Sequence, residues 1–266
     1  MQIPTIPERN GKMIKCVPLF SGSGGNSTYI SCDGEEFLID AGVSCKALTD
    51  TLENIGSSLS AIRGIFVTHE HIDHIKGLEV ISKKYGIPVY MNTNSAKYIY
   101  CTDGFKNLRE KLIILDPTES VTTENTRFDV YKTPHDSWGS VCYRITGTDG
   151  DTLGLATDIG YVTKGIASAL LGCRTVVIES NHDTDMLKNG PYPVYLQNRI
   201  LGKNGHLSNA DCARFLPYLA QSGTEKIHLA HLSKENNLPA LALESAKEAL
   251  KDYAGVGVEV CREKFN

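Results

Sequence analysis

One short segment of the chain gathers most of the side chains that could bind a metal. His69, His71, Asp73 and His74 lie within six positions, directly after the apolar run GIFV, in the sequence THEHIDHIKG. Imidazole and carboxylate groups bind divalent metals such as zinc, and alternate spacing on an extended backbone points His69 and His71 the same way. Packing alone would not select three imidazoles and a carboxylate for one turn. The segment therefore predicts a metal site, with Asp73 and His74 at the start of a helix.

One turn supplies too few donors for the coordination shells of two ions, so others must come from distant loops. Candidates stand where strand-like runs end: His135 in KTPHD, Asp158 in LATDIG and His231 in LAHLS. Active sites gather where strand ends meet loops. Each of these residues, taken singly, is also compatible with an ordinary polar residue on a turn. Their placement and their order after the histidine segment support a shared site.

The elements that must position these residues alternate between strand-like and helical patterns. Strand-like runs are expected at 14–20, 27–31, 36–40, 64–68, 88–91, 111–115, 126–132, 141–146, 152–157, 175–180 and 226–230. Helical patterns occupy 44–55, 75–85, 93–101, 192–201, 208–221 and 239–252. No Pro- or Gly-rich linker divides the chain, which predicts one domain of mixed strands with helices packed outside.

Composition narrows the classes of function. The 266 residues are 41% hydrophobic and 22% charged with a net charge of −4, which describes a chain with a sizeable core and no polycationic surface for coating nucleic acid. The apolar runs are shorter than a membrane helix requires, and the start lacks the order of a signal peptide, so we expect no membrane partner and a cytoplasmic location. Eight cysteines, never closer than thirteen positions, predict buried thiols.

Taken together, the motifs resemble the metallo-β-lactamase superfamily, in which HxHxDH follows an early strand ending in Asp and precedes a later His, Asp and His. The resemblance is closer to the YycJ/WalJ-type metallohydrolases of bacteria, through SGSGGNSTYI, THEHIDHIKGL, TDIGY, ESNHD, GHLSN and AHLSKENN, which span positions 21 to 237. One loop departs slightly, reading SGSGGN where SGSSGN is expected. The resemblance implies an α/β fold, a four-layer αββα sandwich, as a single domain over 1–266 with a short N-terminal extension at 1–12.

Carried over by motif, the resemblance also implies the ligands of two divalent metal ions. They form two triads: His69, His71 and His135 for one ion, and Asp73, His74 and His231 for the other. Asp158 would bridge the two ions, and Asp40 would orient the ligand loop, since ligating histidines commonly need a neighbouring carboxylate. The donor types suit manganese, zinc or iron. The branch is associated with manganese, so we rank manganese first, zinc second and iron third.

The residues expected to act on the substrate come partly from the same resemblance. Asp73 is assigned a catalytic role beside its metal role. His206, in GHLSN, is expected to protonate the leaving group or bind the scissile phosphate, and Glu179 to orient it, as a paired Glu and His do in ribonuclease Z. A plain helix-entry role for His206 stays open. Four residues are expected to contact the substrate: Ser23, Asn26, His182 and Ser233. Trp138 could stack on a base, although single aromatic residues are usually core.

These expectations favour a metal-dependent phosphodiesterase, a nuclease resembling 5′→3′ exodeoxyribonucleases, with DNA or else RNA as its substrate. An alternative is a hydrolase of a small ester, lactone, thioester, β-lactam or cyclic phosphodiester, because the same ions activate water for acyl transfer. A third reading is a metal-bound regulatory protein without turnover. The Gly-rich SGSGGNS loop lacks the Lys that a nucleotide-binding P-loop requires, so no nucleotide cofactor is expected.

Overall fold

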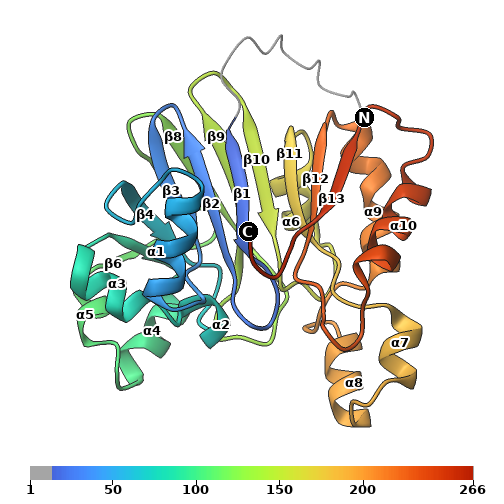
Figure 1. The fold of residues 1–266 in the computed structure, drawn as a ribbon, viewed down its shortest axis with the longest axis horizontal. Helices are drawn as coiled ribbons and strands as arrows, with labels where there is room; N and C mark the ends of the chain where they lie inside the picture. Colours follow the sequence, from blue (N-terminus) through green and yellow to red (C-terminus); the bar gives the residue numbers. More distant parts are fainter. Residues whose placement is uncertain (1–13, 266) are drawn as a thin grey trace.

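The computed structural model describes residues 14–265 and arranges them as two β-sheets packed face to face (Figure 1). The first sheet runs in sequence order: β1 (Lys15–Phe20), β2 (Ser27–Cys32), β3 (Glu35–Ile39), β4 (Ile62–Phe66), β5 (Val89–Met91) and β6 (Leu112–Ile114). The second does too: β7 (Ser120–Thr122), β8 (Thr126–Lys132), β9 (Val141–Gly147), β10 (Thr152–Ala156), β11 (Thr175–Glu179), β12 (Lys226–Ala230) and β13 (Gly257–Val260). The extension predicted at 1–12 lies outside the described residues.

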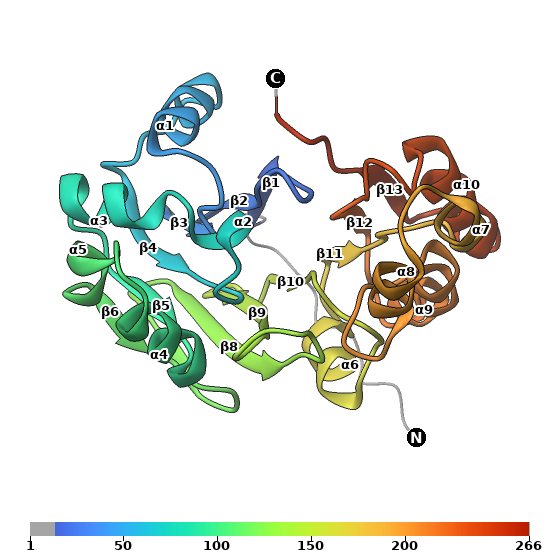
Figure 2. The ribbon, with the colours of Figure 1, turned by 90° about the horizontal axis from the view of Figure 1, so that it is seen from below.

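Helices cover the outer face of each sheet, so that seen from below the two sets lie on opposite sides of the strands (Figure 2). The first sheet is covered by α1 (Cys45–Asn54), α3 (Leu78–Tyr85), α4 (Thr93–Cys101) and α5 (Lys106–Arg109). The second is covered by α6 (Lys164–Leu170), α9 (Asn209–Gln221) and α10 (Pro239–Ala249). Three short helices lie at the lower edge of the sandwich in Figure 1: α2 (Ile72–Ile75), α7 (Thr184–Asn189) and α8 (Val194–Leu201).

Three hydrophobic clusters fill the spaces between these four layers. One joins the first sheet to its helices, for example Leu38 to Leu48, and another joins the second sheet to α6, α9 and α10. Between the sheets lies an aromatic cluster in which the Phe66 and Phe128 rings stack at 3.7 Å. Each layer therefore buries its apolar face against the next. The predicted αββα sandwich is confirmed.

The direction of the strands brings the site residues to one edge. Strands β3 to β6 are parallel to one another, and so are β10 to β13, whereas the remaining neighbours pair antiparallel. Open sheets bind ligands outside the carboxyl ends of parallel strands. The polar residues that follow β3, β4, β10, β11 and β12 meet at the lower edge in Figure 1.

The structure corrects several boundaries. The helix predicted at 75–85 is two helices, α2 and α3, because the chain turns at Gly77, whose N–H donates to the Ala41 carbonyl. Five short elements were not predicted, namely α5, α6, α7, β7 and β13. Each is too short for a clear hydrophobic period.

The structure also shows the state of the cysteines and the length of the apolar helices. All eight cysteines are free of disulfides, and most are buried or half-buried, but Cys101 is exposed, so the prediction of buried thiols fails there. Within 14–265, no helix has the length and apolarity to cross a membrane.

Candidate metal centre

The strand ends that carry the centre have an unusual backbone. Asp40, Asp158 and His231 have φ angles of 61°, 55° and 57°. These are left-handed values that residues with a Cβ atom adopt uncommonly, although Asp and His do so more often than most, and such residues collect at functional sites. Asp40 and His231 directly follow β3 and β12, and Asp158 lies two positions after the end of β10, all strands of the parallel sets. The left-handed turn ends the strand and lets the side chain reach the common edge.

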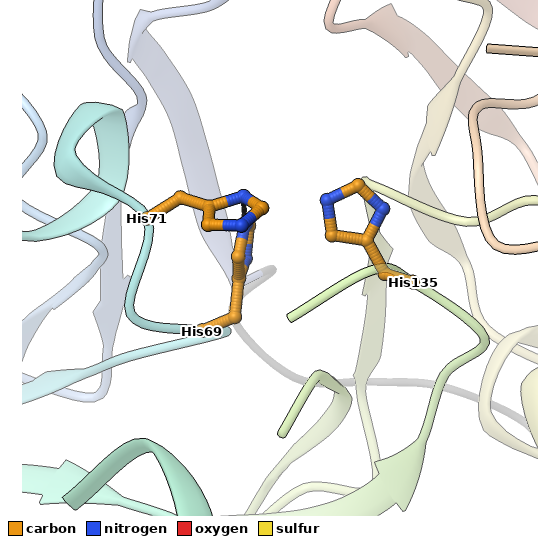
Figure 3. Close-up of side chains that lie close together, drawn as sticks. All are labelled: His69, His71 and His135. Atoms are coloured by element: carbon orange, nitrogen blue, oxygen red, sulfur yellow. Dashed lines mark hydrogen bonds between the residues drawn. The ribbon is translucent and has the colours of Figure 1, made fainter. Parts of the chain in front are cut away.

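The first triad comes from two separate loops. His69 and His71 point into the centre from the segment after β4, and His135 faces them from the loop after β8 (Figure 3). The Nε2 atom of His69 lies 3.0 Å from Nδ1 of His71. One nitrogen of each of the three rings lies within 4.8 Å of the others, which is close enough to share one ion.

The second triad lies beside the first and shares Asp158 with it. Asp73, His74 and His231 also place one donor atom each within 4.8 Å of the others. The carboxylate of Asp158 lies 3.4 Å from Nε2 of His74 and 3.8 Å from Nε2 of His135. A carboxylate between two groups of donors can contact an ion in each.

Hydrogen bonds on the far side of each ring fix which nitrogen faces the centre. Nδ1 of His74 lies 2.8 Å from Asp40, and Nδ1 of His135 lies 3.2 Å from the Gly205 carbonyl. Nδ1 of His69 lies 3.1 Å from the Thr68 hydroxyl, which itself donates to Asp40. These contacts at Nδ1 turn Nε2 of each of the three rings toward the centre, which is how proteins commonly present imidazole to a metal.

Glu179 plays the corresponding part on the side of the second sheet. It is fully buried, and its Oε1 lies 2.8 Å from Nδ1 of both His206 and His231. Its Oε2 accepts the backbone N–H groups of Ile159 and Leu207. Burial opposes ionisation, but the two histidines outweigh it and hold the pKa of Glu179 below its usual range. One carboxylate thus orients a ligand and a catalytic candidate together.

The atoms left without partners fit divalent cations. Among the described residues, Oδ2 of Asp158 and Nε2 of His231 are buried polar atoms with no hydrogen-bond partner. Buried polar groups rarely stay unpaired in folded proteins. A cation between the triads would satisfy both atoms, and the nitrogen and oxygen donors suit a divalent metal.

The charge of the centre makes metal binding depend on pH. Burial lowers the pKa of His69 well below its ordinary value, which keeps this ring neutral. Burial acts the same way on His74, but Asp40 and Asp158 outweigh it and raise the pKa of His74 to about 9. A metal entering the second triad must therefore displace a proton from His74.

Comparisons with known proteins agree with this geometry. The family model described as the beta-lactamase superfamily domain matches residues 35–231, from the first sheet to the end of β12. The chain is 36% identical to the exodeoxyribonuclease YycJ of Bacillus anthracis, over 90% of each chain. It is 34% identical to the exodeoxyribonuclease WalJ of Streptococcus pneumoniae, over 91% of this chain and 90% of that protein. The chain belongs to the metallo-β-lactamase superfamily, in its YycJ/WalJ branch.

Solved structures support the superfamily fold. The metallo-β-lactamase fold protein YhfI of Bacillus subtilis superposes with a TM-score of 0.70 at 15% identity, covering 96% of this chain and 98% of that one. Yeast PDE1 superposes with a TM-score of 0.68 at 12% identity, covering 94% of this chain and 97% of that one. The metallo-β-lactamase sandwich is thus retained at very low identity, so the fold alone does not specify a substrate.

The four residues expected to contact substrate occupy different positions. Ser23 and Ser233 line a cavity of about 170 Å³ together with His206 and His231, so they lie beside the candidate metal centre. Asn26 is buried, and its amide lies 3.0 Å from Nε2 of His74 and 3.3 Å from Asp73. Asn26 therefore contacts two of the expected metal ligands. His182 is 1% exposed, and contact of Asn26 and His182 with the substrate stays a prediction.

Two residues that shape the centre were not singled out from the sequence. Thr68 links Asp40 to His69, as described above, although a lone Thr before the histidines gives no signal by itself. Gly42 packs so tightly that a Cβ atom there would lie 1.6 Å from the Asp73 carbonyl oxygen. Its N–H also donates to the Asn26 carbonyl. Only glycine lets the early loop contact the ligand segment this closely.

Proposed function

We propose that this protein is a metal-dependent phosphodiesterase that removes nucleotides from DNA, acting as a 5′→3′ exodeoxyribonuclease. The observation that carries the proposal is the pair of complete donor triads in a chain 36% identical to a protein named as an exodeoxyribonuclease, over 90% of both lengths. When bound, two divalent ions would supply an activated water and positive charge for the phosphate. Everything else in the reaction falls to this chain's own residues.

The triads have the task of holding the reacting groups in place. Asp158 is buried between them, with its two carboxylate oxygens 3.4 Å from His74 and 3.4 Å from His231. Asp40 and Thr68 fix the rings of His74 and His69 from behind. Donors fixed before the substrate arrives cost no reorganisation during the reaction, which is where much of enzymatic rate enhancement originates.

His206 is suited to protonate the departing oxygen. Its Nδ1 is bound by Glu179, which leaves Nε2 to face the cavity that His206 lines. Burial would lower the pKa of His206, but the charge of Glu179 outweighs it and raises the pKa above the ordinary value. A protonated ring near neutral pH can give its proton to the alkoxide that forms when a phosphodiester is cleaved.

We further propose manganese as the native metal, zinc as the second choice, and DNA rather than RNA as the polymer. The relatives' names support DNA. The net charge of −4 fits an enzyme that holds its anionic substrate mainly at the metal centre rather than over a basic surface.

The test is a substrate panel on protein loaded with Mn²⁺ or with Zn²⁺. The panel contains 5′-phosphorylated single- and double-stranded DNA, RNA, bis-p-nitrophenyl phosphate, a thioester and a β-lactam, with Asp73→Ala as the inactive control. We expect cleavage of DNA and of the model phosphodiester. Activity confined to the acyl substrates would contradict the proposal in favour of the small-ester alternative. Metal binding without any turnover would favour a regulatory protein.

Direction is tested with DNA labelled at one end or the other. A 5′→3′ exonuclease releases a labelled mononucleotide at once from 5′-labelled DNA, whereas 3′-labelled DNA shortens progressively. The reverse pattern would contradict the proposed direction.

A further inference from the structure

The chain's single tryptophan lies in the loop that carries the ligand His135, and its side chain is largely in solvent. Trp138 is 56% exposed and follows the ligand His135 by three positions. Its backbone N–H donates to Oε1 of Glu70 at 2.6 Å, and Glu70 stands between the ligands His69 and His71. The large apolar ring is therefore attached to both loops of the first triad without being part of the core.

A buried network fixes the backbone that carries this ring. Glu70 is only 3% exposed, and its second oxygen accepts the Ser95 hydroxyl at 2.7 Å. The carbonyl of Gly139 accepts the Asn92 amide at 3.0 Å. A Cβ atom on Gly139 would lie 2.3 Å from the Asn92 side-chain oxygen, so the loop sits directly against the start of α4. On one side, the ring of Tyr98 meets the indole edge to face, with centroids 5.8 Å apart.

A buried carboxylate fixes this loop, yet the tryptophan that the loop carries contributes little burial to the folded protein. Burying a carboxylate such as Glu70 is costly unless it is fully hydrogen-bonded, and here its two oxygens hold the tryptophan loop and α4. The ring so positioned buries less than half of its own surface. An exposed aromatic ring on a fixed backbone, in the loop that carries a metal ligand, is a surface on which a planar ligand could stack.

We propose that Trp138 is a stacking platform for a nucleobase of the substrate strand, adjacent to the scissile phosphate, and that Glu70 is its positioning residue. The inference rests on the proposed nuclease function. A base stacks on an aromatic ring whatever its identity, which suits an enzyme that must accept any sequence. Stacking also supplies attraction that a chain with net charge −4 does not provide over its surface.

A base can stack on Trp138 only after it leaves its own duplex stack. Unstacking costs least at a single-stranded or frayed end. The platform therefore predicts that the enzyme binds single-stranded ends more tightly than blunt duplex ends, and that this preference depends on Trp138.

The first experiment uses the intrinsic fluorescence of the metal-loaded protein. Because Trp138 is the only tryptophan, the emission reports on this ring alone. We expect quenching when a single-stranded oligonucleotide with phosphorothioate linkages, which slow cleavage, is added. The same oligonucleotide with abasic sites at its terminal positions should quench much less. Equal quenching by the two would overturn the proposal, because phosphate contact alone would then explain the change.

The second experiment compares variants by DNA binding and steady-state kinetics. Trp138→Ala should weaken binding and raise KM by roughly 5- to 150-fold, the range that loss of one base–aromatic stack gives. Trp138→Phe should restore most of the affinity. Tyr218→Ala is the matched control, since Tyr218 is 60% exposed on α9 and carries no predicted role.

Glu70→Gln should raise KM by a smaller factor with unchanged kcat and metal content, because it keeps one acceptor for the loop. A fall in kcat with loss of metal would show that Glu70 supports the ligands instead. Failure of the unaltered protein to cleave any DNA overturns the proposed function and this inference with it. Normal DNA cleavage that Trp138→Ala leaves unaffected overturns this inference alone.

Discussion

The two sides of the metal centre are built in opposite ways. One comes from a continuous segment, 69–74, in which four ligand-type side chains leave a single turn after β4. The other comes from His135, Asp158 and His231, which reach the centre from three separate strand ends of the second sheet. The first is local, and the second exists only when β8, β10 and β12 are in register.

The residues that hold the two sets of donors in place also come from different parts of the chain. The continuous segment is held by neighbours from the first sheet, namely Asp40 and Asn26, which contact His74 from two sides. Among the dispersed donors, His231 is held by Glu179 at the end of β11, and His135 by the Gly205 carbonyl in the loop between α8 and α9. Each half of the sandwich therefore orients its own donors, and Asp158, one of the dispersed donors, also lies 3.4 Å from Nε2 of His74 in the continuous segment.

Replacing Asp158, which lies between the two sets of donors, should have the largest effect on activity and metal content. Asp158→Asn keeps the shape and tolerates the left-handed backbone, but it removes the charge between the triads. We expect loss of detectable turnover and of at least one metal ion per chain, measured by elemental analysis beside DNA cleavage. Full metal content with normal activity would contradict the bridging role.

Removing His206 should separate chemistry from metal binding. His206→Asn is expected to lower kcat by about 10²- to 10⁴-fold, the usual contribution of a positioned acid, with metal content unchanged. Glu179→Gln should resemble it but also weaken the metal, because Glu179 contacts His231 too. Loss of metal from His206→Asn would show that His206 is a ligand.

The support of the continuous segment is tested by Asp40→Asn. Asn accepts the left-handed backbone at this position, so the fold should survive. The bond to His74 loses its charge, and metal affinity should fall about 10- to 100-fold, as is typical when a carboxylate behind a metal-ligating histidine is removed. A chelator competition measures this change. Unaltered affinity would mean that Thr68 and Asn26 suffice to orient the segment.

A histidine outside the centre, His228, is expected to affect stability and to leave activity unchanged. Burial lowers the pKa of His228 to about 4 from 6.5, despite Glu259 at 2.9 Å. The unfolded chain therefore takes up a proton first as pH falls, so stability is full above pH 6.5 and declines toward pH 4. His228→Gln should flatten this part of the curve by roughly 2–3 kcal/mol, in denaturant unfolding at several pH values. A parallel curve for the variant would contradict the shift.

The contiguous ligands could be predicted from the sequence more directly than the dispersed ones. The segment 69–74 was visible because its ligands are contiguous. The strand and helix patterns predicted mixed strands with helices outside, whereas the four layers came from the family resemblance. His135, Asp158 and His231 could be proposed only from their order and from a family resemblance. The burial of Asn26 and His182 was not foreseen, because a strand-end motif does not indicate which of its side chains point outward.

Other features depend on contacts that no local pattern encodes. Thr68 and Glu70 look like spacers between histidines, yet one links Asp40 to His69 and the other holds the tryptophan loop. Trp138 resembles a core residue by type, and only its neighbours show that its backbone is fixed while its ring stays exposed. Contacts between residues distant in the chain decide such roles.

The strand order also governs when a newly made chain can become active. A ribosome delivers the first sheet and segment 69–74 early, and domains generally form from the N-terminal end during synthesis. Yet His231 follows β12, so a nascent chain ending at β11 holds one complete triad and lacks a donor of the other. The unfinished protein therefore cannot assemble the paired site until β12 and His231 have been made.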